Sequence, residues 1–77
     1  MKIRKNVDLD ILESFGYHYE PYLLFPTYQK KIIYGNYVIT VDVLIKDRTV
    51  FINKSSYITK RNIHYINDLI SEHLIEE

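Results

Sequence analysis

The sequence contains no cysteine and no tryptophan, and it has only two glycines and two prolines in 77 residues. Without cysteine the chain forms neither disulfides nor thiolate metal sites, and thiol catalysis is excluded. A domain of this size without disulfides depends on packing or on self-association for its stability. The scarcity of glycine and proline, together with 47% hydrophobic residues, predicts one ordered domain spanning residues 1–77.

The sequence also lacks an excess of either charge, because ten basic residues balance ten acidic residues. General nucleic-acid binders usually carry net positive charge, so neutrality disfavours that class but still allows a local basic patch. No apolar run approaches the ~20 residues of a membrane span. The basic start MKIRKNVDLD is not followed by the apolar stretch of a signal peptide. We therefore expect a cytoplasmic protein that does not bind membranes.

Two segments are predicted to be helical, one near each end of the chain. In NVDLDILESFG, Asn6 or Asp8 can cap the first helix, and Gly16 can end it in the left-handed conformation. The second helix is predicted from Thr59 or Lys60 onward. Its apolar stripe at helical spacing consists of Ile63, Ile66, Ile70 and Leu74.

Between the helices, the segment YQKKIIY-GN-YVITVDVLIK-DR-TVFINK predicts three strands in a meander. Tyr34 then faces Tyr37 across the first turn, and Ile45 faces Val50 across the second. Because side chains alternate between faces, the predicted core face carries Tyr28, Ile32, Tyr34, Tyr37, Ile39, Val41, Val43, Ile45, Val50 and Ile52. The predicted fold is α+β with the order α-β-β-β-α, a three-stranded antiparallel meander with both helices packed on one face.

The opposite face of the sheet and the segment YHYEPYLLFPTY contain candidate contact residues. Two prolines make residues 17–27 an edge strand or a loop rather than a central strand. Unless this segment covers the polar face, apolar side chains remain exposed there, which indicates a partner. The candidate partner-binding residues are Tyr17, Tyr19, Tyr22, Ile33, Val38, Leu44 and Phe51. The partner is either another protein or a second copy in a homodimer.

A basic cluster at the start of the second predicted helix supports an alternative. Basic residues there, and Glu72, Glu76 and Glu77 at the far end, oppose the helix dipole, which favours the reverse arrangement. Free N–H groups beside cations can bind phosphate, although a solvated helix end also tolerates such charges. The candidate phosphate-binding or nucleic-acid-binding residues are Lys54, Lys60, Arg61, Lys30 and Lys31.

The sequence contains no specific motif for catalysis or for metal binding. His64 and Asp68 have helical i, i+4 spacing, for which a structural salt bridge is the common explanation. No cluster supplies the three or four ligands of a zinc site. We therefore expect no metal, no cofactor and no enzymatic activity.

The α-β-β-β-α order and the basic TKRN position resemble the double-stranded RNA-binding domain, which implies duplex binding through the second helix. The Gly-Pro-X-His loop of that family is replaced here by Gly35-Asn36, and its lysine run is absent. ILESFGY is similar to the opening of HicA-type toxins, which are small ribonucleases. Their Gly-Ser-His-His stretch has no counterpart, since His18 lacks the glycine, so no catalytic residue is carried over.

VDLDILESFGY and INDLISEHLIEE, at the two ends of the chain, resemble small uncharacterised proteins of low-GC Gram-positive bacteria and their phages. That resemblance implies an accessory protein of phage or mobile-element origin, without a known activity. The sequence thus leaves two main hypotheses, a non-catalytic interaction protein and a nucleic-acid-binding module. A ribonuclease dependent on His18 is the third.

Overall fold

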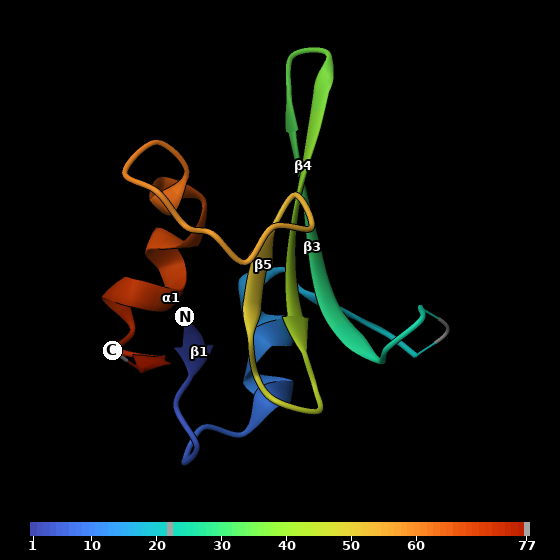
Figure 1. Ribbon diagram of the computed structural model, residues 1–77. Helices are drawn as coiled ribbons and strands as arrows, with labels where there is room; N and C mark the ends of the chain where they lie inside the picture. Colours follow the sequence, from blue (N-terminus) through green and yellow to red (C-terminus); the bar gives the residue numbers. More distant parts are fainter. Residues whose placement is uncertain (22, 77) are drawn as a thin grey trace.

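The computed structural model describes residues 1–21 and 23–76 as a small α+β domain (Figure 1). A four-stranded antiparallel sheet has the order β2-β3-β4-β5, and the two ends of the chain form the two-stranded sheet β1-β6. The elements in chain order are β1 Lys2–Ile3, the 3-10 helix η1 Leu9–Phe15, β2 His18–Glu20, β3 Thr27–Tyr34, β4 Tyr37–Leu44, β5 Val50–Ile52, the 3-10 helix η2 Ile63–Ile66, α1 Asn67–Ser71 and β6 Ile75–Glu76. The α+β class is confirmed, whereas the observed order is more complex than α-β-β-β-α.

The β3–β4 hairpin has the predicted register, with Tyr34 opposite Tyr37 and Tyr28 opposite Val43. Gly35 has a φ of 60°. Positive φ at the first central residue alone is the pattern of a type II′ turn, whose twist matches that of the flanking strands. A two-residue turn allows only one pairing of the strands that it joins, which is why the sequence was sufficient here.

The β4–β5 pairing differs from the prediction by two residues, because Val50 faces Val43 rather than Ile45. The loop spans residues 45–49, and Arg48 adopts the left-handed conformation with a φ of 65°. Its amide donates to the Leu44 carbonyl at 2.8 Å. A shift of two residues leaves every side chain on its predicted face.

Residues 18–20 form the edge strand β2, which pairs with β3 from His18–Gln29 to Glu20–Thr27. An edge strand was one of the two predictions for the segment 17–27. Because β2 lies beside β3 in the same sheet, this strand extends the sheet instead of covering its polar face.

Helix η1 has the predicted boundaries. Asp8 is its N-cap and accepts a hydrogen bond from the Asp10 amide at 3.4 Å. Gly16 ends it with a φ of 89°, and its amide donates to the Glu13 carbonyl at 3.1 Å. The Tyr17 amide donates to the Leu12 carbonyl at 3.1 Å. This pair of bonds is a Schellman motif, which commonly brings the residue after the glycine into the apolar layer.

The long C-terminal helix was predicted wrongly. Helical structure begins only at Ile63 and ends at Ser71. The His73 amide donates to Ile70 and the Leu74 amide to Leu69, both at 3.0 Å, and His73 has a φ of 58°. These bonds form a second Schellman motif with histidine at the position where glycine is preferred. The chain therefore turns back and pairs β6 with β1.

The two predicted faces of this helix also need correction. Leu69 is fully buried, whereas Ile70 is 37% exposed. Tyr65, which does not belong to the predicted apolar stripe, is half-buried and packs against the core. The change of helix type at Ile66 and Asn67 alters the rotation per residue, so a single stripe at 3.6-residue spacing does not describe both parts.

The core lies between the sheet, η1, α1 and the paired chain ends. Its buried apolar side chains are Ile3, Leu9, Leu12, Tyr17, Val41, Val43, Val50, Ile52, Ile66, Leu69, Leu74 and Ile75. Tyr34 and Tyr37 were predicted on the core face, but they are 65% and 71% exposed. Figure 1 gives the reason: the turn end of the β3–β4 hairpin projects beyond the helices that cover the rest of the sheet.

The left-handed conformation of His73 generates a prediction about stability. This conformation costs a residue with a Cβ atom roughly 1–2 kcal/mol of conformational free energy, whereas glycine adopts it without this cost. We expect His73→Gly to raise the free energy of unfolding by about 1 kcal/mol in urea titrations. Ser71→Gly, an exposed change inside the helix, serves as the control and should lower it. A loss of stability in His73→Gly would contradict the Schellman assignment.

Candidate functional site

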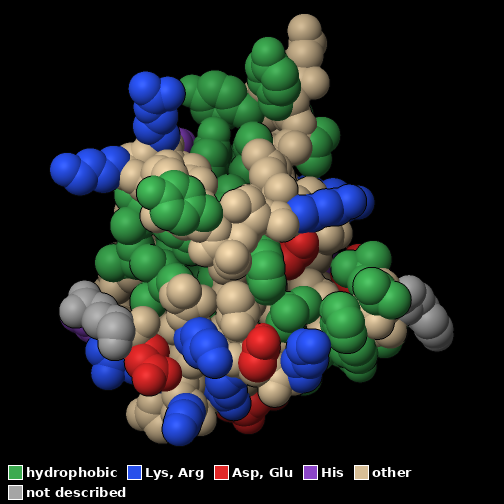
Figure 2. All heavy atoms as spheres, in the orientation of Figure 1, with side chains coloured by type: hydrophobic (Ala, Val, Ile, Leu, Met, Phe, Trp, Pro, Cys, Tyr) green, Lys and Arg blue, Asp and Glu red, His purple; other side chains and the backbone are tan. Residues whose placement is uncertain are grey.

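The exposed turn end of the hairpin carries four large apolar side chains, here named the tip patch: Ile33, Tyr34, Tyr37 and Val38. Their exposed fractions are 78%, 65%, 71% and 56% in that order. Ile33 lies opposite Val38, and Tyr34 lies opposite Tyr37. Because neighbouring residues point to opposite faces, the tyrosines lie on one face and the two aliphatic residues on the other. Hydrophobic side chains gather around this end of the molecule in Figure 2.

Strand lengths explain why the tip patch is exposed. Strands β3 and β4 have 8 residues each, whereas β2 and β5 have 3 each. Strand β2 pairs with β3 only up to Gln29, and β5 pairs with β4 only between Val41 and Val43. The last residues of the hairpin therefore have no neighbouring strand on either edge within the described chain. The ten residues from Ile32 to Val41 also contain no charged side chain.

Two of the predicted apolar contact residues are separated from this patch. Leu44 and Phe51 are half-buried, and they pair with Thr27 and Asp42 rather than with each other. The Gln29 side-chain amide donates to Asp42 at 2.8 Å across the same face. This polar pair lies beside Phe51 and between Leu44 and the tip. The predicted face therefore carries an interrupted apolar surface, of which Ile33 and Val38 are the exposed part.

The tyrosines of the predicted aromatic edge do not share one environment. Tyr19 is 50% exposed, and its ring lies 5.6 Å from that of Tyr28. Tyr22 lies outside the described residues. Tyr17 is only 1% exposed and belongs to the core, so its assignment to a partner-binding edge is wrong. The Gly16 stop places Tyr17 at the buried position of the Schellman motif, a signal that the sequence already contained.

A second exposed apolar segment was missed in the sequence. Leu23, Leu24 and Phe25 are 44%, 91% and 43% exposed. The Lys46 ammonium group lies 4.0 Å from the centroid of the Phe25 ring, in a cation–π arrangement. Two flanking prolines keep this stretch out of the ladder, and that was the signal for an apolar loop.

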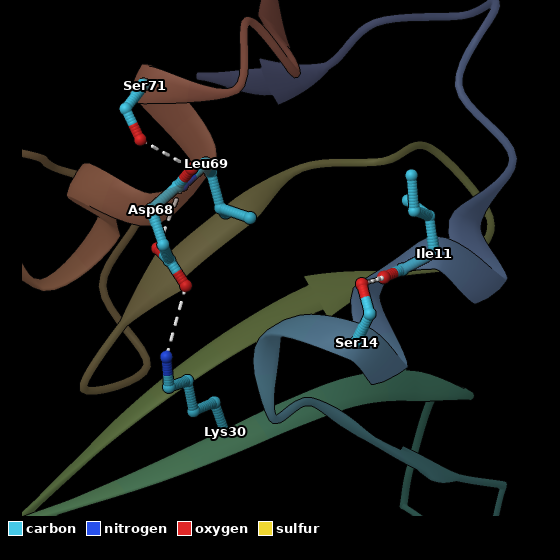
Figure 3. A network of polar contacts seen from close by, with 6 residues as sticks. All are labelled: Ile11, Ser14, Lys30, Asp68, Leu69 and Ser71. Atoms are coloured by element: carbon cyan, nitrogen blue, oxygen red, sulfur yellow. Dashed lines mark hydrogen bonds and ion pairs between the residues drawn. The ribbon is translucent and has the colours of Figure 1, made fainter.

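The predicted basic residues do not converge. Lys30 is half-buried, and its ammonium group binds the Asp68 carboxylate at 3.1 Å, linking β3 to α1 (Figure 3). Lys31 points to the opposite face of the same strand. The other predicted residues, Lys54, Lys60 and Arg61, are exposed beyond β5.

The amides that were predicted to receive phosphate are partly occupied. The Thr59 amide donates to the Asn62 side chain at 2.7 Å, and the Arg61 amide donates to the Thr59 hydroxyl at 3.2 Å. Both donors are therefore satisfied within the chain. The helix predicted to begin at Thr59 or Lys60 begins only at Ile63, so its dipole does not act at this cluster.

The three histidines lie on different parts of the fold: His18 in β2, His64 in η2 and His73 after α1. Asp68 pairs with Lys30 and not with His64, whose ring lies 4.0 Å from that of Tyr65. His18 lines a shallow hollow of about 250 Å³ together with Gly16, Glu20, Gln29 and Lys31. Across residues 1–21 and 23–76, no group of three or more His, Asp or Glu side chains could hold a metal ion.

Tyr17 has an unusual electrostatic environment. Its hydroxyl is buried and has no hydrogen-bond partner among the described residues. Burial raises the pKa of this hydroxyl well above its ordinary value, and the nearby Asp68 carboxylate raises it further. The Lys30 ammonium group lies 5.4 Å from the ring centroid. The Lys30–Asp68 pair thus stands beside the buried ring, where it joins the sheet to the helix.

Because of Tyr17, we expect the free energy of unfolding to change with pH in the alkaline range. The folded state keeps the phenol protonated while the unfolded chain loses the proton above about pH 10. The free energy of unfolding should therefore fall as pH rises past that value. We expect Tyr17→Phe to weaken this fall and to add about 1 kcal/mol at neutral pH. Urea unfolding from pH 8 upward measures both effects, with the exposed Tyr57→Phe as control. An equal fall in both variants would contradict this role for Tyr17.

Comparisons with known proteins add no information about this site. No family model, no curated protein and no solved structure matches the chain. Among the helices of the described residues, none is both long enough and apolar enough to cross a membrane.

Proposed function

We propose that this protein is a non-catalytic cytoplasmic accessory protein that binds another protein chain through its tip patch. The observation that carries the proposal is the exposure of Ile33, Tyr34, Tyr37 and Val38 at 56–78% on a projecting hairpin. Contiguous exposed apolar surface is uncommon in soluble monomers and usually marks a contact site.

Fold stability does not account for this choice of residues. The four side chains are largely in water, so burial within the chain contributes little from them. Threonine has a β-branched side chain that fits a strand as well as valine or isoleucine does. An apolar tip therefore raises the risk of aggregation without a comparable gain in folding, unless a partner covers it.

Electrostatics favour a protein over a nucleic acid at this surface. Sites that stack bases combine aromatic rings with a positively charged groove. Tyr34 and Tyr37 form an exposed aromatic pair, but the charge-free stretch around them supplies no cation. On their face of β3 the nearest basic residue is Lys30, which is already paired with Asp68.

The contact surface can be tested with a photoreactive side chain at Asn36, in the turn between the two tyrosines. We expect cross-links to protein in cells of the native host. Ile33→Thr/Val38→Thr should reduce them about tenfold or more, because two apolar side chains leave the interface while strand propensity is kept. The control is Tyr57→Ser, which changes a 77% exposed tyrosine on another loop.

Two outcomes would refute the proposal. Either Asn36 cross-links to nothing, or its cross-links persist unchanged in Ile33→Thr/Val38→Thr. Circular dichroism of each variant confirms that the hairpin remains folded, so that a lost cross-link reports the surface.

The nucleic-acid alternative makes a separate prediction. Phosphate contacts are strongest at low ionic strength. We expect no measurable affinity for duplex RNA or DNA at ~50 mM salt in fluorescence anisotropy. Binding that disappears in Lys60→Ala/Arg61→Ala would instead establish the basic cluster as a nucleic-acid site.

A further inference from the structure

We infer that the occupant of the tip patch is a second copy of this chain, so that the exposed ends of two hairpins pack side by side in a reversible homodimer. This inference rests on the proposed function and names its partner. It is carried by the charge of the patch, by its symmetry and by its area.

The first observation is the absence of charge around the patch. When identical surfaces meet, any charged group near the symmetry axis is brought close to its own copy, and such like charges cost several kcal/mol. The ten residues from Ile32 to Val41 contain no charged side chain. The patch therefore meets its own copy without this penalty, whereas basic and acidic side chains are mixed on the lower part of the face shown in Figure 2.

The second observation is the arrangement of residues in the hairpin. A two-fold contact requires a patch that is complementary to itself. Tyr34 lies directly opposite Tyr37, and Ile33 lies directly opposite Val38. A copy rotated by half a turn about an axis perpendicular to the hairpin can lie beside it, edge to edge, because the strand edges at the tip have no neighbouring strand among the described residues. This arrangement places tyrosine beside tyrosine on one face and aliphatic beside aliphatic on the other. Paired tyrosine rings can stack with an offset while their hydroxyls remain in water.

The third observation is the size of the patch. A fully covered tyrosine buries about 150–250 Å², so the two exposed tyrosines with Ile33 and Val38 offer on the order of 300–500 Å² per copy. Two copies together bury less than the roughly 1,600 Å² of a standard interface and fall in the range of weak, transient contacts. We therefore expect a dimer that dissociates on dilution, with a Kd of about micromolar or weaker.

Sedimentation velocity of the purified full chain, from low micromolar to several hundred micromolar, tests the inference. The wild type should convert from monomer to dimer across this range. Ile33→Thr/Val38→Thr and Tyr34→Ser/Tyr37→Ser should each raise the Kd about tenfold or more, since each removes the apolar side chains of one face. Tyr57→Ser should leave the Kd unchanged.

Position can be tested independently, because the chain has no cysteine of its own. A spin label attached to Asn36→Cys should show short-range dipolar coupling between copies at high concentration. The same label on Lys5→Cys, in the turn after β1, should not. Coupling at Asn36 should vanish when Ile33→Thr/Val38→Thr is combined with the label.

The outcomes separate this inference from the proposed function. A wild type that stays monomeric at several hundred micromolar, while Asn36 still forms patch-dependent cross-links in cells, overturns self-association and leaves a different protein as the partner. A dimer that persists in both patch variants also overturns it. A monomer whose tip forms no cross-links overturns both proposals together.

Discussion

The backbone of residues 1–4 is the constraint on which the rest of this small fold depends. The Met1 carbonyl accepts from the Val50 amide, and the Ile3 amide donates to the Arg48 carbonyl, both at 3.0 Å. On its other edge this strand pairs with Ile75 and Glu76. The first strand thus joins the main sheet to the end of the chain, and it places the fully buried Ile3 between them. Without cysteine, backbone pairing performs the closure that disulfides provide in many small domains.

This closure decides where the core lies along the hairpin. Arg48 reinforces it by donating from Nη1 to the carbonyls of Arg4 and Val7 at 2.8 and 2.6 Å. The chain ends, the helices and β5 all gather near the part of the sheet that contains Val41 and Val43. Within the described residues, neither β2 nor β5 reaches the turn end of the two 8-residue strands. The exposure of the hairpin end is therefore a consequence of the same arrangement that buries the core.

The sequence was sufficient where a local motif allowed one geometry. Gly35-Asn36 determined the hairpin register, and Gly16 determined the end of η1. At Arg48 and His73 the chain adopts left-handed conformations without glycine, so no residue signalled the geometry of the loop between β4 and β5 or the end of the last helix. At Arg48, bonds to the first residues of the chain override the local preference. The pairing of the chain ends could not be predicted either, since β1 and β6 have only 2 residues each.

For the candidate site too, the sequence pattern predicted some features, and others depended on the tertiary structure. Alternation correctly placed Ile33 and Val38 on the face away from the core, and it also placed Tyr34 and Tyr37 on the core face. Period-2 alternation assigns a side chain to a face, but it contains no information about how far neighbouring elements extend along that face. Burial of Val41 and exposure of Tyr37, four residues apart on one face of one strand, differ only because β5 and the helices end between them. Exposure of an apolar residue on a predicted core face is thus a property of the whole domain, and at this hairpin it defines the surface through which we propose that a partner binds.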